Sequence, residues 1–136
     1  MREEILKQFF LGEVSAKALA SDLVGSMVTE DSVVTRHLIE DMKDGFEVMP
    51  DHLVHLCDAV LSGKIKAKYL QAIGFCILAS DHFEYDTDTP EGNLVGETVS
   101  DWSAPKINYP LTIGNVRKFR GRLVTGRNLF AAEGAI

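Results

Sequence analysis

Apolar residues recur along most of the chain at the three- and four-residue spacing of an amphipathic helix. The strict alternation of apolar and polar residues that is typical of a half-buried strand is not sustained over any segment. The pattern therefore predicts an all-α fold, a compact bundle of about five to seven helices.

Two segments share a helix-turn-helix pattern. "FLGEVSAKAL" (residues 10–19) and "LSGKIKAKYL" (residues 61–70) align without gaps and place Gly12 opposite Gly63. Glycine readily takes the left-handed conformation that closes a helix, and Ser15 has the side chain of a helix N-cap. The pattern predicts two glycine-terminated helix hairpins, either as a true repeat or because any such hairpin needs these residues.

Between these segments, the second helix is expected to reach Met27. A third should run from about Asp31 or Ser32 to Gly45, and Pro50 should open the fourth, since proline is favoured in the first turn of a helix.

In the second half of the chain, the pattern predicts a central helix over 66–81. The later positions of this helix, including Phe75 and Leu78, leave it hardly any polar face. A short helix is expected over 93–102. The two prolines of 103–112 indicate an extended connection.

Ile107 and Tyr109 are available to pin this connection onto the core. Thr112 should cap a last helix whose apolar side includes Ile113, and whose basic side faces water and carries Arg117, Lys118, Arg120 and Arg122.

The 136 residues are 46% hydrophobic and 25% charged, as in an ordinary globular domain. We expect a single domain over 1–136 with a less ordered tail at 126–136. The longest apolar run, 72–79, is too short to cross a membrane, and charges at the N-terminus argue against a signal peptide. These features predict a cytoplasmic protein without membrane contact, in which Cys57 and Cys76 are free core residues.

The net charge of −6 is unevenly distributed. Residues 1–104 hold 19 acids against 8 Lys and Arg, whereas residues 105–136 hold one acid against 6. Residues 81–101 contain seven acids and no Lys or Arg. Such a field repels nucleic acid and attracts a basic protein.

The stretch "DTDTPEGNLVGE" (residues 86–97) has the acids of a calcium-binding EF-hand loop at its first, third and twelfth positions. Pro90 and Glu91 occupy the fifth and sixth, where the loop needs an oxygen ligand and a glycine. We therefore favour a surface turn at Thr89–Gly92 over a calcium site.

His52 and His55 stand three apart on the fourth predicted helix and could share one face. A zinc site needs further ligands, so two solvated histidines are the preferred interpretation, while His37 and His82 have no evident partner. Motifs for nucleophilic catalysis or phosphate binding are missing from the sequence. We expect no enzymatic activity, no cofactor and no metal.

The basic segment 116–127 could be a nucleic-acid-binding helix. The acidic remainder favours a different interpretation, in which this helix lies against the acidic body, near residues 81–101.

The start of the chain, "LKQFFLGEVSAKALASDL", resembles small helical bacterial immunity proteins of the colicin and contact-dependent growth inhibition type. The shared pattern is a hydrophobic helix followed by Gly12, Glu13, Val14, Ser15 and Ala16. The relatives continue with two acids and an aromatic residue, which Lys17, Ala18 and Leu19 replace here. The resemblance covers some twenty residues and implies a compact helical protein that binds and blocks a toxin.

The leading hypothesis is a non-enzymatic protein that acts by protein–protein contact with a basic, toxin-like partner. The predicted partner-binding residues are Glu84, Tyr85, Asp86, Asp88, Glu91 and Trp102. The two aromatic residues are candidate anchors; Trp102 is first of all expected in the core, and Tyr85 is open between the two roles. The alternative is a small regulatory or ligand-binding module with a pocket between the two hairpins, edged by His52 and His55.

Overall fold

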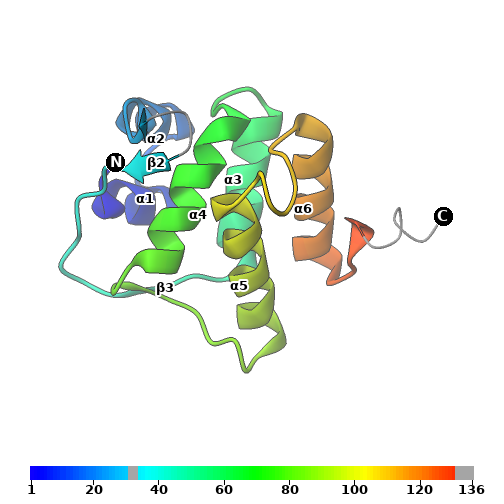
Figure 1. Ribbon diagram of the computed structural model, residues 1–136. Helices are drawn as coiled ribbons and strands as arrows, with labels where there is room; N and C mark the ends of the chain where they lie inside the picture. Colours follow the sequence, from blue (N-terminus) through cyan, green and yellow to red (C-terminus); the bar gives the residue numbers. More distant parts are fainter. Residues whose placement is uncertain (31–33, 131–136) are drawn as a thin grey trace.

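The computed structural model (Figure 1) describes residues 1–30 and 34–130 of the chain. The architecture is mostly helical, as the apolar spacing predicts. The helices are α1 (Glu3–Phe10), α2 (Ala16–Leu23), α3 (Pro50–Leu61), α4 (Leu70–Ala79), α5 (Pro90–Ser103) and α6 (Ile113–Thr125), with a 3-10 turn η1 (Ala67–Tyr69) before α4. No helix in these two ranges is both long enough and apolar enough to cross a membrane.

Two pairs of short strands accompany the helices. They are β1 (Met27–Glu30) antiparallel to β2 (Val34–His37), and β3 (Phe46–Glu47) parallel to β4 (Phe83–Glu84). The predicted third helix is therefore wrong over 34–45, while residues 31–33 lie outside the described part of the chain. The second helix ends at Leu23 because Gly25, with φ of +77°, turns the chain into β1. The valines and threonines of this region favour strand over helix.

Two of the predicted helices begin at the expected N-cap residues, and a third begins earlier than predicted. The hydroxyl of Ser15 accepts from the Ala18 amide and that of Thr112 from the Asn115 amide, each at 3.1 Å, so both predicted N-caps are confirmed. Helix α5 begins at Pro90, three residues before the predicted position. Gly12 and Gly63 both have left-handed backbones after their helices, while their relation as repeats stays a prediction.

Helix α4 packs closely along α5 (Figure 1). Gly74 is buried at this contact, and a Cβ added there would lie 2.7 Å from the Cβ of Trp102 and 2.8 Å from the carbonyl oxygen of Val99. Only glycine therefore allows the two helices to approach this closely. The exposed side of α4 is apolar, with Phe75 at 37% and Leu78 at 45% exposure.

The connection 103–112 packs onto the core through Tyr109, as predicted, but Ile107 is 85% exposed and was wrongly assigned there. Ile113, expected on the core side of α6, is also exposed. Tyr109 stacks on Phe130 with ring centroids 3.9 Å apart, and Phe130 is buried. The packed part of the tail therefore reaches at least Phe130, and residues 131–136 lie outside the described ranges.

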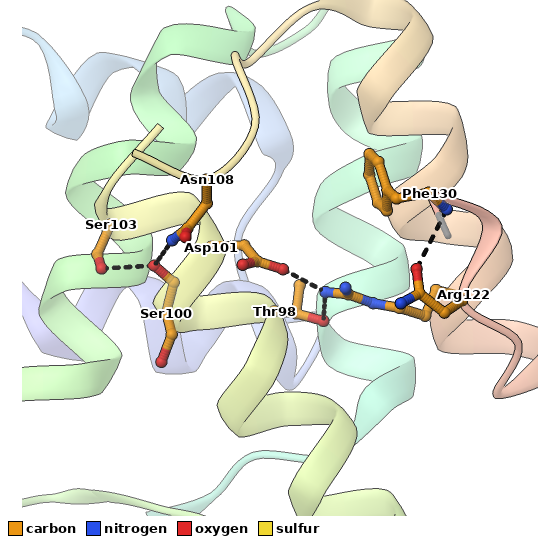
Figure 2. A network of polar contacts seen from close by, with 8 residues as sticks. Thr98, Ser100, Asp101, Ser103, Asn108, Arg122 and Phe130 are labelled. Carbon is orange, nitrogen blue, oxygen red and sulfur yellow. Dashed lines mark hydrogen bonds and ion pairs between the residues drawn. The ribbon is translucent and has the colours of Figure 1, made fainter. Parts of the chain in front are cut away.

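Arg122 corrects the predicted solvent-facing basic side of α6, because it is 4% exposed. Its Nη2 donates to Asp101 Oδ2 at 2.8 Å and to Thr98 Oγ1 at 3.2 Å, both on α5 (Figure 2). Arg120 pairs with Asp58 on α3. The basic helix therefore lies against the acidic body, and Asp101 belongs to the predicted acidic block.

Candidate interaction surface

Four of the predicted partner-binding acids lie on one short connection between β4 and α5. Glu84 is the last residue of β4, Asp86 and Asp88 follow in the loop, and Glu91 lies in the first turn of α5. All four are exposed. The structure therefore brings these carboxylates together, as their closeness in the sequence predicts.

The loop is held in shape by its own hydrogen bonds. Asp86 Oδ1 accepts from the Asp88 amide at 2.9 Å, and the Asp86 carbonyl accepts from the Thr89 amide and hydroxyl at 3.1 and 2.8 Å. Thr89 Oγ1 then caps α5 by accepting from the Gly92 amide at 3.0 Å. A Cβ at Gly92 would overlap the Asp86 carbonyl. The acids are thus presented by an ordered segment.

These hydrogen bonds place the turn at other residues than predicted. They also bear on whether the segment can form a calcium-binding loop. The turn lies at Asp86–Thr89, and Pro90, Glu91 and Gly92 form the first turn of α5. The last eight positions of the EF-hand-like stretch are therefore helical, and Glu97 lies on α5. The segment does not have the conformation of a calcium loop.

Tyr85 lies inward between the exposed acids. Its ring lies over Gly96 of α5, where an added Cβ would be 3.2 Å from the ring carbon Cε2. It is half-buried against the core, and burial raises the pKa of its phenol. Tyr85 therefore covers the core first and offers a partner only its remaining exposed part.

Trp102 does not belong to this surface. It is fully buried and meets Phe119 edge to face at a centroid distance of 6.1 Å. The prediction of Trp102 as a partner anchor is wrong, and the core assignment preferred for it is confirmed.

Glu47 is a further acid at this site, which the sequence analysis missed. It pairs in register with Glu84 in the parallel strands β3 and β4, and both side chains are exposed. In the described part of the chain, no Lys, Arg or His pairs with either glutamate. Two-residue parallel strands 37 positions apart have no sequence pattern that predicts such pairing. We call Glu47, Glu84, Asp86, Asp88 and Glu91 the acidic surface.

The histidine pair of α3 is divided between two environments. His52 Nδ1 accepts from the Met49 amide at 2.8 Å, and its ring lies near those of Phe10 and Phe46. Burial, and then the neighbouring His55, lower the pKa of His52. The expected solvation is therefore wrong for His52 and correct for His55, which is exposed.

His55 lines a pocket of about 440 Å³ between the turn after α1 and the end of α3. The alternative hypothesis expects a pocket between the two hairpins, edged by His52 and His55, and of these two histidines only His55 lines this one. Over residues 1–30 and 34–130, no group of three His, Cys, Asp or Glu side chains is placed to hold a metal ion.

A buried carboxylate was also missed. Glu3 is 1% exposed, accepts from the Met42 amide at 3.0 Å and lies 3.4 Å from His82 Nδ1. Cys76 Sγ is 4.0 Å from Glu3 Oε2. Glu3 lies at helical spacing from Leu6 and Phe10, which are buried on the same side of α1. This spacing is the sequence signal that could have predicted the burial of Glu3.

Comparisons of the chain with protein-family models, curated proteins and solved structures found no match. The likeness of the first two helices to immunity proteins therefore stays a prediction.

Proposed function

We propose that this is a non-enzymatic binding protein that recognises a basic protein partner through the acidic surface. The observation that carries the proposal is the adjacent pairing of Glu47 and Glu84. Like charges on neighbouring strands repel each other, so this arrangement is unfavourable in the free protein. A cationic partner would remove this repulsion on binding.

Two further features support the same role. The loop is ordered by the hydrogen bonds of Asp86 and Thr89, so little entropy is lost when its carboxylates meet a partner. In addition, Arg120 and Arg122 form ion pairs with Asp58 and Asp101. These two arginines therefore do not neutralise the acidic surface. An uncompensated acidic field accelerates association with a basic protein.

The partner class that we propose is a basic toxin, such as a nuclease, which the protein would block in the cytoplasm in the manner of an immunity protein. The support is the resemblance of residues 6–23 to that family and the acidic surface, a natural complement to a protein that binds nucleic acid.

The test is affinity capture from a lysate of the source organism, followed by mass spectrometry, at low and at moderate salt. The wild-type protein should retain a basic protein that moderate salt releases. Glu84→Gln/Asp88→Asn should retain much less of it.

The control is Glu4→Gln/Glu13→Gln, which removes the same charge at exposed positions of α1 and of the turn that follows it. It should capture the partner as the wild type does. Equal capture by both double variants would refute the acidic surface as the binding site.

A further inference from the structure

We propose that a pocket beside the buried carboxylate of Glu3 receives an arginine side chain of the basic partner. This inference rests on the proposed function for the identity of the partner. It adds the chemical group of the partner that the protein recognises.

The pocket has a volume of about 190 Å³. It lies between the end of β2, the segment that follows β2, and the C-terminal half of α4, and its lining includes Glu3, His37, Asp41, Phe75 and Cys76. It thus combines a buried carboxylate, an exposed carboxylate and an aromatic pair around one space.

The charge of Glu3 is incompletely compensated. Its Oε1 accepts from the Met42 amide and lies 3.4 Å from His82 Nδ1, and its Oε2 accepts from the Cys76 thiol at 4.0 Å. In the described ranges no Lys or Arg pairs with it. A buried carboxylate that lacks a full cationic partner is costly, so a cation entering the pocket gains a strong interaction. Asp41, exposed on the lining, adds a second negative charge.

The aromatic side of the pocket favours a planar cation. His37 stacks on Phe75 with ring centroids 4.3 Å apart and planes inclined by 16°. Burial lowers the pKa of His37, which favours the neutral imidazole over a charged one that would repel a cation. A guanidinium group is favoured over an ammonium group, because it stacks on rings and matches a carboxylate with two parallel donors.

The probe is N-acetyl-arginine amide, titrated into the ¹⁵N-labelled protein and followed by NMR, with N-acetyl-citrulline amide as the neutral analogue of the same shape. The arginine compound should shift the Met42 amide resonance, which reports on Glu3, with a dissociation constant on the order of 1 mM. The citrulline compound should not.

Glu3→Gln keeps an oxygen acceptor for the Met42 amide and should abolish probe binding. Asp41→Asn, at an exposed position, provides a second variant that should fold normally and bind the probe about 3-fold more weakly. A third compound, N-acetyl-lysine amide, tests the preference for a guanidinium group and should bind more weakly than the arginine compound. Unchanged affinity in Asp41→Asn and Glu3→Gln, or equal affinity for the lysine or citrulline compound, would overturn the proposal.

The acidic-surface variant Glu84→Gln/Asp88→Asn separates this proposal from the previous one. It should retain much less of the protein partner yet bind the arginine probe as the wild type does. Failure of the probe to bind the wild type refutes the pocket alone, whereas failure to capture a basic protein refutes the proposed function alone.

Discussion

Arg122 on α6 and Asp101 on α5 form an ion pair of 2.8 Å in which the arginine side chain is 5% exposed. The guanidinium carbon lies 5.4 and 5.7 Å from the ring centroids of Phe119 and Phe130. The pair therefore connects the two helices at a place where aromatic rings exclude water. A charge in such an environment depends strongly on its partner.

Removal of Asp101 takes away the carboxylate partner of this buried charge and leaves it the hydrogen bond to the Thr98 hydroxyl. We expect Asp101→Ala to lower the free energy of unfolding by about 3 kcal/mol, measured by urea denaturation. The double replacement Arg122→Met/Asp101→Leu should cost less than Asp101→Ala, because no unpaired charge remains. Arg120→Met, which breaks the more exposed pair with Asp58, is the control and should change stability little. A greater loss in Arg120→Met than in Asp101→Ala would contradict this account.

The contact of Gly74 with Trp102 predicts that Gly74→Ala destabilises the protein by about 2 kcal/mol, because the added methyl group forces α4 and α5 apart. Gly114→Ala is the matched control. It lies in the first turn of α6, where an added Cβ meets only Thr112 Oγ1 at 4.0 Å, so it should raise stability by up to about 1 kcal/mol. Thermal unfolding of both variants decides the point, and a stable Gly74→Ala protein would disprove the close approach.

The lowered pKa of His52 predicts a loss of stability in acid. Because burial holds this pKa below its ordinary value of 6.5, the unfolded chain binds a proton more readily than the folded protein. The free energy of unfolding should therefore fall as the pH drops below about 6.5. His52→Gln should show a smaller difference between urea midpoints at pH 7.5 and 5.5 than the wild type. An identical pH dependence in both proteins would remove His52 from the explanation.

Cys57 and Cys76 are buried, and burial raises the pKa of the Cys57 thiol to about 12 and that of Cys76 further still. Since the thiolate is the reactive form, neither should be alkylated by iodoacetamide at pH 8 in the folded protein. Both should react once urea unfolds the chain, and mass spectrometry counts the adducts. Rapid modification in the absence of urea would show that the core opens easily.

The sequence predicts those features that depend on neighbouring residues. The N-caps Ser15 and Thr112 and the buried apolar side of α3 follow from local hydrogen bonding and helical spacing, and the structure confirms them. Residues 27–30 and 34–37 were misjudged because a weak apolar spacing was preferred to their β-branched residues.

The features that the sequence does not predict involve residues that lie far apart in the chain. Glu47 meets Glu84, and Glu3 meets His82, only after the chain has folded. The burial of Arg122 was equally hidden, since a basic residue on an amphipathic helix is ordinarily solvated, and the rings of Phe119 and Phe130 lie over it only in the folded chain.

If the like-charged pair of Glu47 and Glu84 serves binding at the expense of stability, removal of one of the two charges should make the free protein more stable. Glu47→Gln should raise the free energy of unfolding by about 0.5 kcal/mol at low salt, and the gain should shrink as salt screens the repulsion. Urea denaturation at two salt concentrations measures both effects. Glu13→Gln, an exposed acid far from β3 in the sequence, is the control and should show no such gain. A destabilised Glu47→Gln protein would contradict the like-charge account.

The central claim is tested most directly by calorimetric titration of the recovered basic protein into the wild type, Glu84→Gln/Asp88→Asn and Glu4→Gln/Glu13→Gln, at 50 and 300 mM sodium chloride. We predict that the first double variant weakens binding by about tenfold at low salt and flattens its salt dependence, whereas the second binds as the wild type does. Equal dissociation constants for all three proteins would show that the acidic surface is not where the partner binds.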